Sequence, residues 1–154
     1  MERLRQAFLV TPSRQEVFGT DTEALPGTRR ALRRQMEQTF RRYHLIGTGL
    51  EGQVSVPYAG PRLRFTFDYS YRPNGAAHYI HGLALHNNVS DASKLCFVFE
   101  RLRARAEESP ELTAVLDDSF PDDTRELLES SAIVTRPASQ IDDLAFSIRG
   151  ELGM

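Results

Sequence analysis

The stretch Leu63-Arg-Phe-Thr-Phe-Asp-Tyr-Ser-Tyr71 decides the expected fold, because hydrophobic and polar residues alternate in it without a break. An alternation with a period of two is typical of a β-strand that covers a core with one face. The odd-numbered residues, which are all aromatic or aliphatic, would face the core. The even-numbered ones, including Asp68, would point away from it, toward water, Arg64 or a neighbouring hydroxyl. We therefore expect a strand over 63–71 whose single acid lies on its polar side.

Two further strands are expected around this one. Residues 53–58 precede it and end at Gly60-Pro61, and a mostly apolar strand over 77–85 follows the turn Pro73-Asn74-Gly75. A three-residue turn would place His78 opposite Ser70 and next to Asp68. The same register would put His81 opposite Phe67, in the core.

Helical and strand patterns alternate through the rest of the chain. Helices are expected over 28–43, 90–108, 122–130 and 139–152, and short buried strands over 112–116 and 133–136. Residues 1–27 form a lead-in or a linker remnant, and residues 28–154 form a single domain. The order α-β-β-β-α-β-α-β-α predicts an α/β fold, with a mixed sheet of about five strands flanked by helices.

Composition narrows the class of protein. The chain has 154 residues, and Cys96 is its only cysteine, which excludes an internal disulfide and a thiolate metal cluster. Cys96 lies in an apolar helical run, so we expect it in the core. Apolar runs are only a few residues long, so we expect no membrane span and a cytoplasmic location.

The charges are unevenly spread. Residues 1–72 hold 12 arginines against 7 acids, and residues 73–154 hold 7 basic residues against 14 acids. Arg30, Arg33, Arg34 and Arg41 fall on the exposed side of the expected first helix, where each could neutralise a phosphate of a nucleic acid. A solvated face, or self-association with the acidic half of another copy, explains the pattern equally well.

Two resemblances follow from these segments. The run LRFTFDYSYRPNGAAHYIHGLALHN, with DASKLCFVFERLRA, LTAVLDD and IVTRPASQIDDLA, resembles the C-terminal module of an uncharacterised family of two-domain bacterial and prophage proteins. The element order also resembles the α-β-β-β-α-β core of the restriction-endonuclease-like superfamily. That resemblance implies an acid on the second strand, which Asp68 matches. It also implies a Glu-x-Lys on the third strand, where this chain has neither an acid nor a lysine.

The candidate catalytic residues belong to this second resemblance. Asp68 and Asp117 would be ligands of Mg²⁺ or Mn²⁺, since hard cations prefer oxygen ligands, and His78 would act as a base. Asp117 follows an expected parallel strand, where ligands gather in α/β sheets, although acids there are also ordinary loop residues. A place on the solvated side of its strand explains Asp68 better than a metal site does, because Arg64, Thr66 and Ser70 share that side.

The sequence favours a non-enzymatic accessory or interaction domain of a bacterial or phage-related protein, which needs no cofactor. Its partner would be a nucleic acid bound through the basic helix, or another protein. One alternative is a divalent-metal-dependent nuclease or phosphodiesterase, and another is a homo-oligomeric structural module. Salt dependence of binding, metal-dependent cleavage and the molecular mass in solution would distinguish the three.

Overall fold

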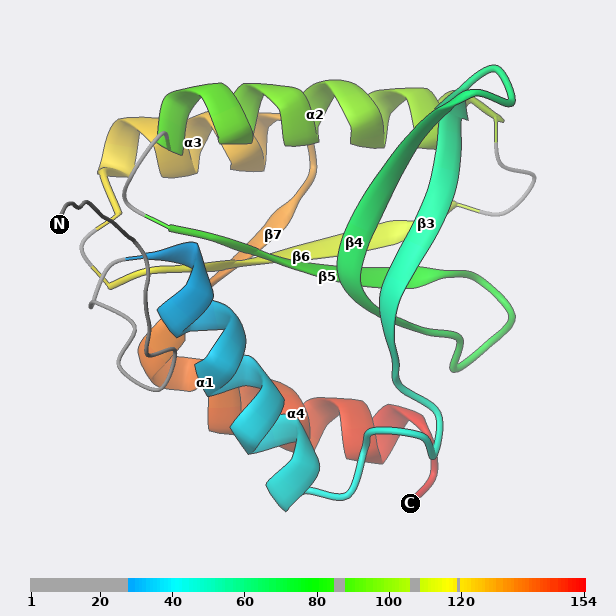
Figure 1. Cartoon of the computed structure of the whole chain (residues 1–154), viewed down its shortest axis with the longest axis vertical. Helices are drawn as coiled ribbons and strands as arrows, with labels where there is room; N and C mark the ends of the chain where they lie inside the picture. Colours follow the sequence, from blue (N-terminus) through cyan, green and yellow to red (C-terminus); the bar gives the residue numbers. More distant parts are fainter. Residues whose placement is uncertain (1–27, 85–87, 106–108, 119) are drawn as a thin grey trace, which may run out of the picture.

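A five-stranded mixed sheet forms the centre of the molecule in a computed structural model that describes residues 28–84, 88–105, 109–118 and 120–154 (Figure 1). Its strands run in the spatial order β3-β4-β5-β6-β7. They are β3 (Glu51–Ala59), β4 (Leu63–Tyr71), β5 (His78–Leu83), β6 (Glu111–Leu116) and β7 (Val134–Pro137). The first three pair antiparallel, and the last three pair parallel, which confirms the predicted mixed α/β sheet. The expected lead-in over 1–27 and the end of the third strand at residue 85 lie outside the described residues.

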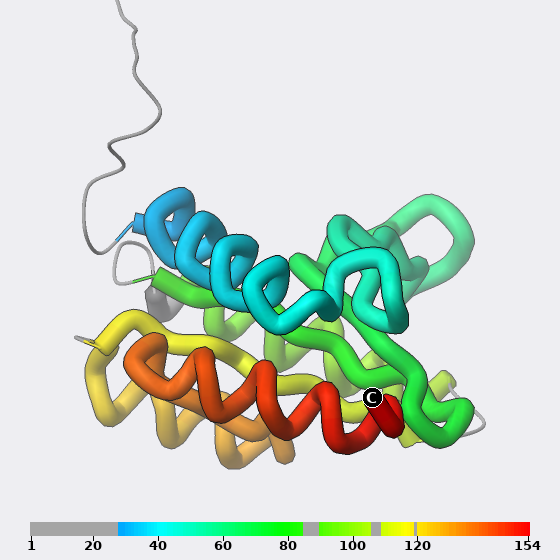
Figure 2. Tube along the Cα trace, turned by 90° about the horizontal axis from the view of Figure 1, so that it is seen from below, coloured from blue at the N-terminus to red at the C-terminus, as the bar shows by residue number. Residues whose placement is uncertain are grey.

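Helices cover both faces of the sheet. They are α1 (Arg29–Arg42), α2 (Asn88–Arg105), α3 (Asp122–Ser130) and α4 (Ile141–Glu151), with a short 3₁₀ turn, η2 (Ala138–Gln140), before α4. α1 and α4 lie on one face, and α2 and α3 lie on the other (Figures 1 and 2). Each pair encloses its own apolar core cluster. Cys96 of α2 is buried in one of these clusters, as its apolar surroundings in the sequence predict. No helix within the described residues combines the length and apolar composition of a membrane crossing.

The register between β4 and β5 differs by one residue from the prediction. Ser70 lies opposite Tyr79, and Tyr71 lies opposite His78. The predicted pairing of His78 with Ser70 is therefore wrong, because the connection between the strands spans residues 72–77 and not a three-residue turn. A shift of one residue moves every side chain to the opposite face, so His78 loses its predicted place beside Asp68.

The predicted alternation of β4 is also wrong in part. Phe67 packs in the cluster under α2 and α3, whereas Tyr69, two residues later, packs in the cluster under α1 and α4. Strict alternation would place both on one face. The cause lies in the strand pairing near Asp68. The ladder between β4 and β5 ends with the pair Tyr69 and Ile80, so Asp68 has no ladder partner on β5. On the other side of β4, Gln53 of strand β3 has a left-handed φ of 55°. β4 leaves β5 here and turns a different side inward.

Candidate nucleic-acid interface

Asp68 lies at the point where β4 separates from β5, and its side chain is only 2% exposed. This corrects the prediction that it faces water or pairs with Arg64. Its two carboxylate oxygens accept hydrogen bonds of 2.8 Å each from the guanidinium of Arg29. Arg33 adds a longer ion pair, with Nε at 3.5 Å from Oδ1, while Arg64 instead donates to Ser55. The paired acid is therefore held by the first turns of α1.

The Arg29–Asp68 pair also supplies hydrogen-bond partners for the backbone of β5, beyond the point where β4 stops pairing with it. If the ladder continued, Gly82 would lie opposite Phe67. Instead, the Gly82 N–H donates to Asp68 Oδ2 at 2.9 Å, and the Gly82 carbonyl accepts from Arg29 at 3.0 Å. Because an unpaired buried peptide group is costly, the Arg29–Asp68 pair stabilises the opening between the strands. Gly82 also allows α1 to approach: a Cβ there would lie 2.9 Å from side-chain atoms of Leu32 and Met36.

Electrostatics keep this pair ionised. Burial alone would raise the pKa of Asp68. The hydrogen bonds from Arg29, the positive charges of His81 and Arg29, and the hydrogen bond from the Gly82 N–H together outweigh burial. The pKa of Asp68 therefore lies below its usual value. Burial likewise opposes the charge on Arg29, yet Asp68 and the charge of Asp91 raise its pKa overall. Burial lowers the pKa of His81 to about 4, so its imidazole is neutral at neutral pH.

The arrangement does not fit a divalent cation as it stands. Both oxygens of Asp68 already face a guanidinium, which would repel a metal ion at the same place. Across the described residues, no three or more histidine, cysteine, aspartate or glutamate side chains are grouped to hold a metal.

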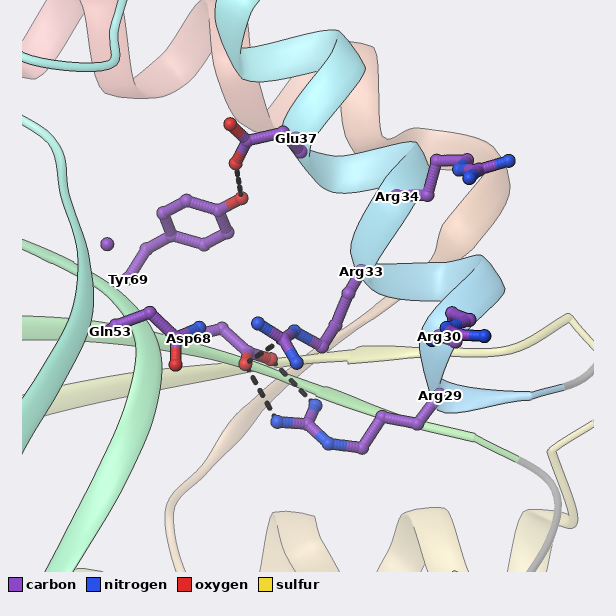
Figure 3. A pocket seen from close by; sticks show the side chains of 9 residues that line it. Arg29, Arg30, Arg33, Arg34, Glu37, Gln53, Asp68 and Tyr69 are labelled. Carbon is purple, nitrogen blue, oxygen red and sulfur yellow. Dashed lines mark hydrogen bonds and ion pairs between the residues drawn. The ribbon is translucent and has the colours of Figure 1, made fainter. Parts of the chain in front are cut away.

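A cleft of about 540 Å³ opens beside Asp68, between the start of α1 and strands β3 and β4 (Figure 3). Its lining includes four arginines and two acids: Arg29, Arg30, Arg33, Arg34, Glu37 and Asp68. Arg29 and Arg33 point toward Asp68, while Arg30 and Arg34 extend from the opposite side of the same turns. Glu37 accepts hydrogen bonds of 2.6 Å from Tyr69 and from Arg41. The arginines thus outnumber the acids at this end of the helix.

These arginines lie at the N-terminus of α1, where an isolated helix disfavours positive charge. α1 begins at Arg29 after its N-cap Thr28, whose hydroxyl accepts from the Ala31 N–H at 3.1 Å. Four arginines fall within residues 29–34, and the first turn holds no acid. Cations are disfavoured at a helix N-terminus by about 0.3–1 kcal/mol each, because the helix dipole is positive there. Such a concentration of positive potential favours an anion.

The other predicted residues are not brought to Asp68 by the contacts seen here. Arg41 lies outside the cleft lining and pairs with Glu37. His78 lies 3.2 Å from the Tyr71 hydroxyl and 3.7 Å from Glu111, at the opposite end of β5. Asp117 follows β6, at the same end of the sheet as Gly82, and its N–H donates to the Leu83 carbonyl at 3.2 Å. The catalytic roles of His78 and Asp117 and the metal role of Asp117 stay predictions.

Sequence reasoning missed Arg29, and it placed His81 correctly in the core but opposite Phe67 and not beside Asp68. Arg29 makes the shortest contacts to Asp68, and His81 is 6% exposed with a buried Nδ1 that has no hydrogen-bond partner. That nitrogen lies 3.6 Å from Asp68 Oδ2. A partial signal for Arg29 was present: it stands four residues before Arg33 and one residue after a predicted N-cap, so both arginines share one helix face. No local signal marked their common partner, which is 39 positions away from Arg29.

Fold and cleft together define an α/β domain with a mixed sheet and an arginine-lined cleft between its first helix and strands β3 and β4. No family model matches the chain, and no curated protein matches it. Among solved structures, protein VC1899 from Vibrio cholerae is similar, with a TM-score of 0.52 and 14% identity over 81% of this chain and 33% of that chain. The EndoMS–dsDNA2 complex has a TM-score of 0.49 and 18% identity over 74% of this chain and 45% of that chain. The chain thus spans less than half the length of both, and the similarity to VC1899 shows the fold alone.

Proposed function

We propose that this domain binds the phosphate backbone of a nucleic acid, without cleaving it, through the arginines at the start of α1. The observation that carries the proposal is the clustering of four arginines in two helical turns around one cleft, against the preference of the helix dipole. Guanidinium groups match phosphate oxygens in bidentate geometry, and a helix N-terminus adds backbone N–H donors.

The charge balance of the cleft supports this ligand class. Asp68 neutralises one arginine charge through Arg29, and Glu37 is shared between Tyr69 and Arg41. Four arginines and two acids line the cleft, and Arg30 and Arg33 are exposed, so a phosphate group can reach them from solvent. Because backbone contacts carry no base information, we expect little dependence on nucleotide sequence.

Binding should be tested by fluorescence anisotropy, with labelled single-stranded DNA, double-stranded DNA and RNA in buffer containing EDTA. Each phosphate neutralised on duplex DNA contributes about −0.9 to the slope of log K against log salt, so two to four arginine contacts predict a slope of about −2 to −4. The variant Arg30→Glu/Arg34→Glu should bind at least about tenfold more weakly and with a shallower slope.

A matched control is Arg62→Glu/Arg101→Glu, which makes the same change of charge at two exposed arginines outside the cleft lining. It should retain most of the affinity. Equal losses in the two double variants would show that only net charge matters. Absence of salt-sensitive binding to all three nucleic acids would reject the proposal.

The nuclease alternative has one observation in its favour: Asp68 lies on the second of the three antiparallel strands, where the resemblance implies a metal-binding acid. The Arg29 contacts oppose it. Incubation of each nucleic acid with Mg²⁺ or Mn²⁺ separates the two functions. We expect no cleavage; metal-dependent cleavage that Asp68→Ala removes would replace the binding function with the nuclease.

The wider setting stays a prediction. It comprises a bacterial or phage-related accessory domain in the cytoplasm that has a protein partner or associates with itself. One pair of opposite charges is already joined within the chain, since Arg42 of α1 forms an ion pair with Asp142 of α4. A mass measurement that shows only monomer would remove the oligomer hypothesis.

A further inference from the structure

A second cleft, of about 230 Å³, lies on the α2 side of the Arg29–Asp68 pair. Strands β4 and β5 and helix α2 form its walls, and the lining side chains include Phe65, Thr66, His81, Asp91 and Lys94. Arg29 lines this cleft and also the arginine-lined cleft beside α1, and its side chain is 37% exposed. The two clefts therefore meet at Arg29, and an elongated anion that follows the arginines of α1 can reach the second cleft past this side chain.

The wall of the second cleft combines aromatic rings with a positive charge. The ring centroids of Phe65 and His81 lie 5.0 Å apart, and Phe65 is only partly buried. Burial lowers the pKa of His81 to about 4, so both rings are uncharged at neutral pH. The exposed Lys94 holds its Nζ 5.8 Å from the centroid of the Phe65 ring. A nucleotide matches this pair of features, because its base stacks on aromatic rings and its phosphate pairs with an ammonium group.

The size and the polar groups of the second cleft fit one base. Pockets for whole small molecules measure about 300–1,000 Å³, so a cleft of about 230 Å³ suits a single planar group. Thr66 and Asp91 add a hydroxyl and a carboxylate, which can accept hydrogen bonds from the N–H groups on the edge of a base. A duplex cannot supply such a group, because its bases are stacked and paired inside the helix. The cleft therefore selects an unpaired base.

We propose that the nucleic acid bound by this domain is single-stranded, with its phosphates on the arginines of α1 and one unpaired base in the cleft of Phe65, His81 and Lys94. This inference rests on the proposed function and names the form of nucleic acid that the interface takes. Every base has a ring face, so stacking on Phe65 is compatible with the expected low dependence on sequence. The hydrogen bonds from Arg29 to Asp68 fix the side chain that joins the two clefts.

The test compares three labelled ligands of about 12 nucleotides by fluorescence anisotropy in buffer containing EDTA. They are a single strand of thymidines, an abasic strand of the same length, which keeps the phosphates and lacks the bases, and a duplex. The wild type should bind the thymidine strand at least about fivefold more tightly than the abasic strand or the duplex, because base stacking on an aromatic ring contributes about that much. Equal affinity for the thymidine and abasic strands would overturn the inference, and this comparison needs no variant.

Variants then locate the base. Phe65→Leu keeps an apolar side chain against the core and removes the ring, so it should bind the thymidine and abasic strands equally. Lys94→Gln changes an exposed residue and should weaken binding of both strands, with a salt slope shallower by about 0.7. Circular dichroism should show native folding of each variant, and if Phe65→Leu is unfolded, the wild-type comparison and Lys94→Gln decide.

The matched control is Phe97→Leu. Phe97 also lies on the α2 side, is 47% exposed and has the Arg101 guanidinium 5.0 Å from its ring centroid, but it lines neither cleft. This variant should keep the wild-type preference for the thymidine strand. If Phe97→Leu loses the preference, or Phe65→Leu retains it, the base lies elsewhere and the inference is wrong.

The two proposals fail on different results. Absence of salt-sensitive binding to all three ligands rejects the proposed function and this inference with it. Salt-sensitive binding that is equal for the thymidine and abasic strands keeps the arginine interface of α1 and rejects only the base cleft.

Discussion

Replacing Arg29 by alanine leaves the Asp68 carboxylate buried without its main partner. Removing one member of a buried ion pair costs about 3–5 kcal/mol, because the remaining charge stays desolvated. Here the cost should lie near the lower end, about 3 kcal/mol, since Arg33 and the Gly82 N–H remain close to Asp68. Arg29 is itself 37% exposed, so solvent screening weakens the lost pair.

The reverse change should cost less. Asp68→Asn keeps an oxygen that can accept the Gly82 N–H, and the half-exposed Arg29 can turn toward water. We expect a loss of about 1.5 kcal/mol, typical of a hydrogen bond to a charged group. The two costs should not add in Arg29→Ala/Asp68→Asn, because each single change already removes the pair.

The pH dependence gives the sharper test. In the wild type the pKa of Asp68 lies below its unfolded value of about 3.9, so its contribution is present above about pH 4 and is lost as the pH falls further. In Arg29→Ala, burial without the main partner raises the pKa of Asp68, so the folded state takes up a proton as the pH falls. The loss in free energy of unfolding relative to the wild type should therefore shrink on acidification. Urea unfolding at pH 7 and pH 5, both with EDTA, should show a smaller difference from wild type at pH 5. A deficit below about 1 kcal/mol at pH 7, or an equal deficit at both values, would refute the ion-pair reasoning.

Three further changes test the surroundings of the site. Gly82→Ala forces side-chain atoms of Leu32 and Met36 away from 2.9 Å contacts, and it should cost about 1–3 kcal/mol in urea unfolding and weaken nucleic-acid binding by shifting α1. Thr28→Ala removes the N-cap hydrogen bond of α1 and should lower the free energy of unfolding by about 1 kcal/mol, with no change at the far helices. His81 has a folded pKa of about 4 against about 6.5 unfolded, so the unfolded chain binds more protons between these values and stability falls as the pH drops through that window. His81→Phe should remove this part of the acid sensitivity, and an unchanged slope of stability between pH 6.5 and pH 4 would contradict it.

The sequence by itself determined the elements and the class of fold. Unbroken alternation over 63–71, helical spacing after Thr28 and the turn signals between them depend on local backbone geometry, which neighbouring residues control. The order of these elements then restricts the topology, because parallel strands require crossover connections. For the same reason the burial of Cys96 was predictable from its apolar neighbours.

Only the tertiary structure decided the register of β4 and β5 and the partner of Asp68. A connection over 72–77 that is longer than the expected turn moved His78 to the opposite end of β5, and a single residue of slip is enough to change faces. Arg29 lies 39 positions from Asp68 in the chain, and they meet because the first turns of α1 pack against Gly82 of β5, beyond the point where β4 stops pairing with that strand. Such a long-range meeting depends on how two strands separate, and the local pattern that marks each strand carries no information about it.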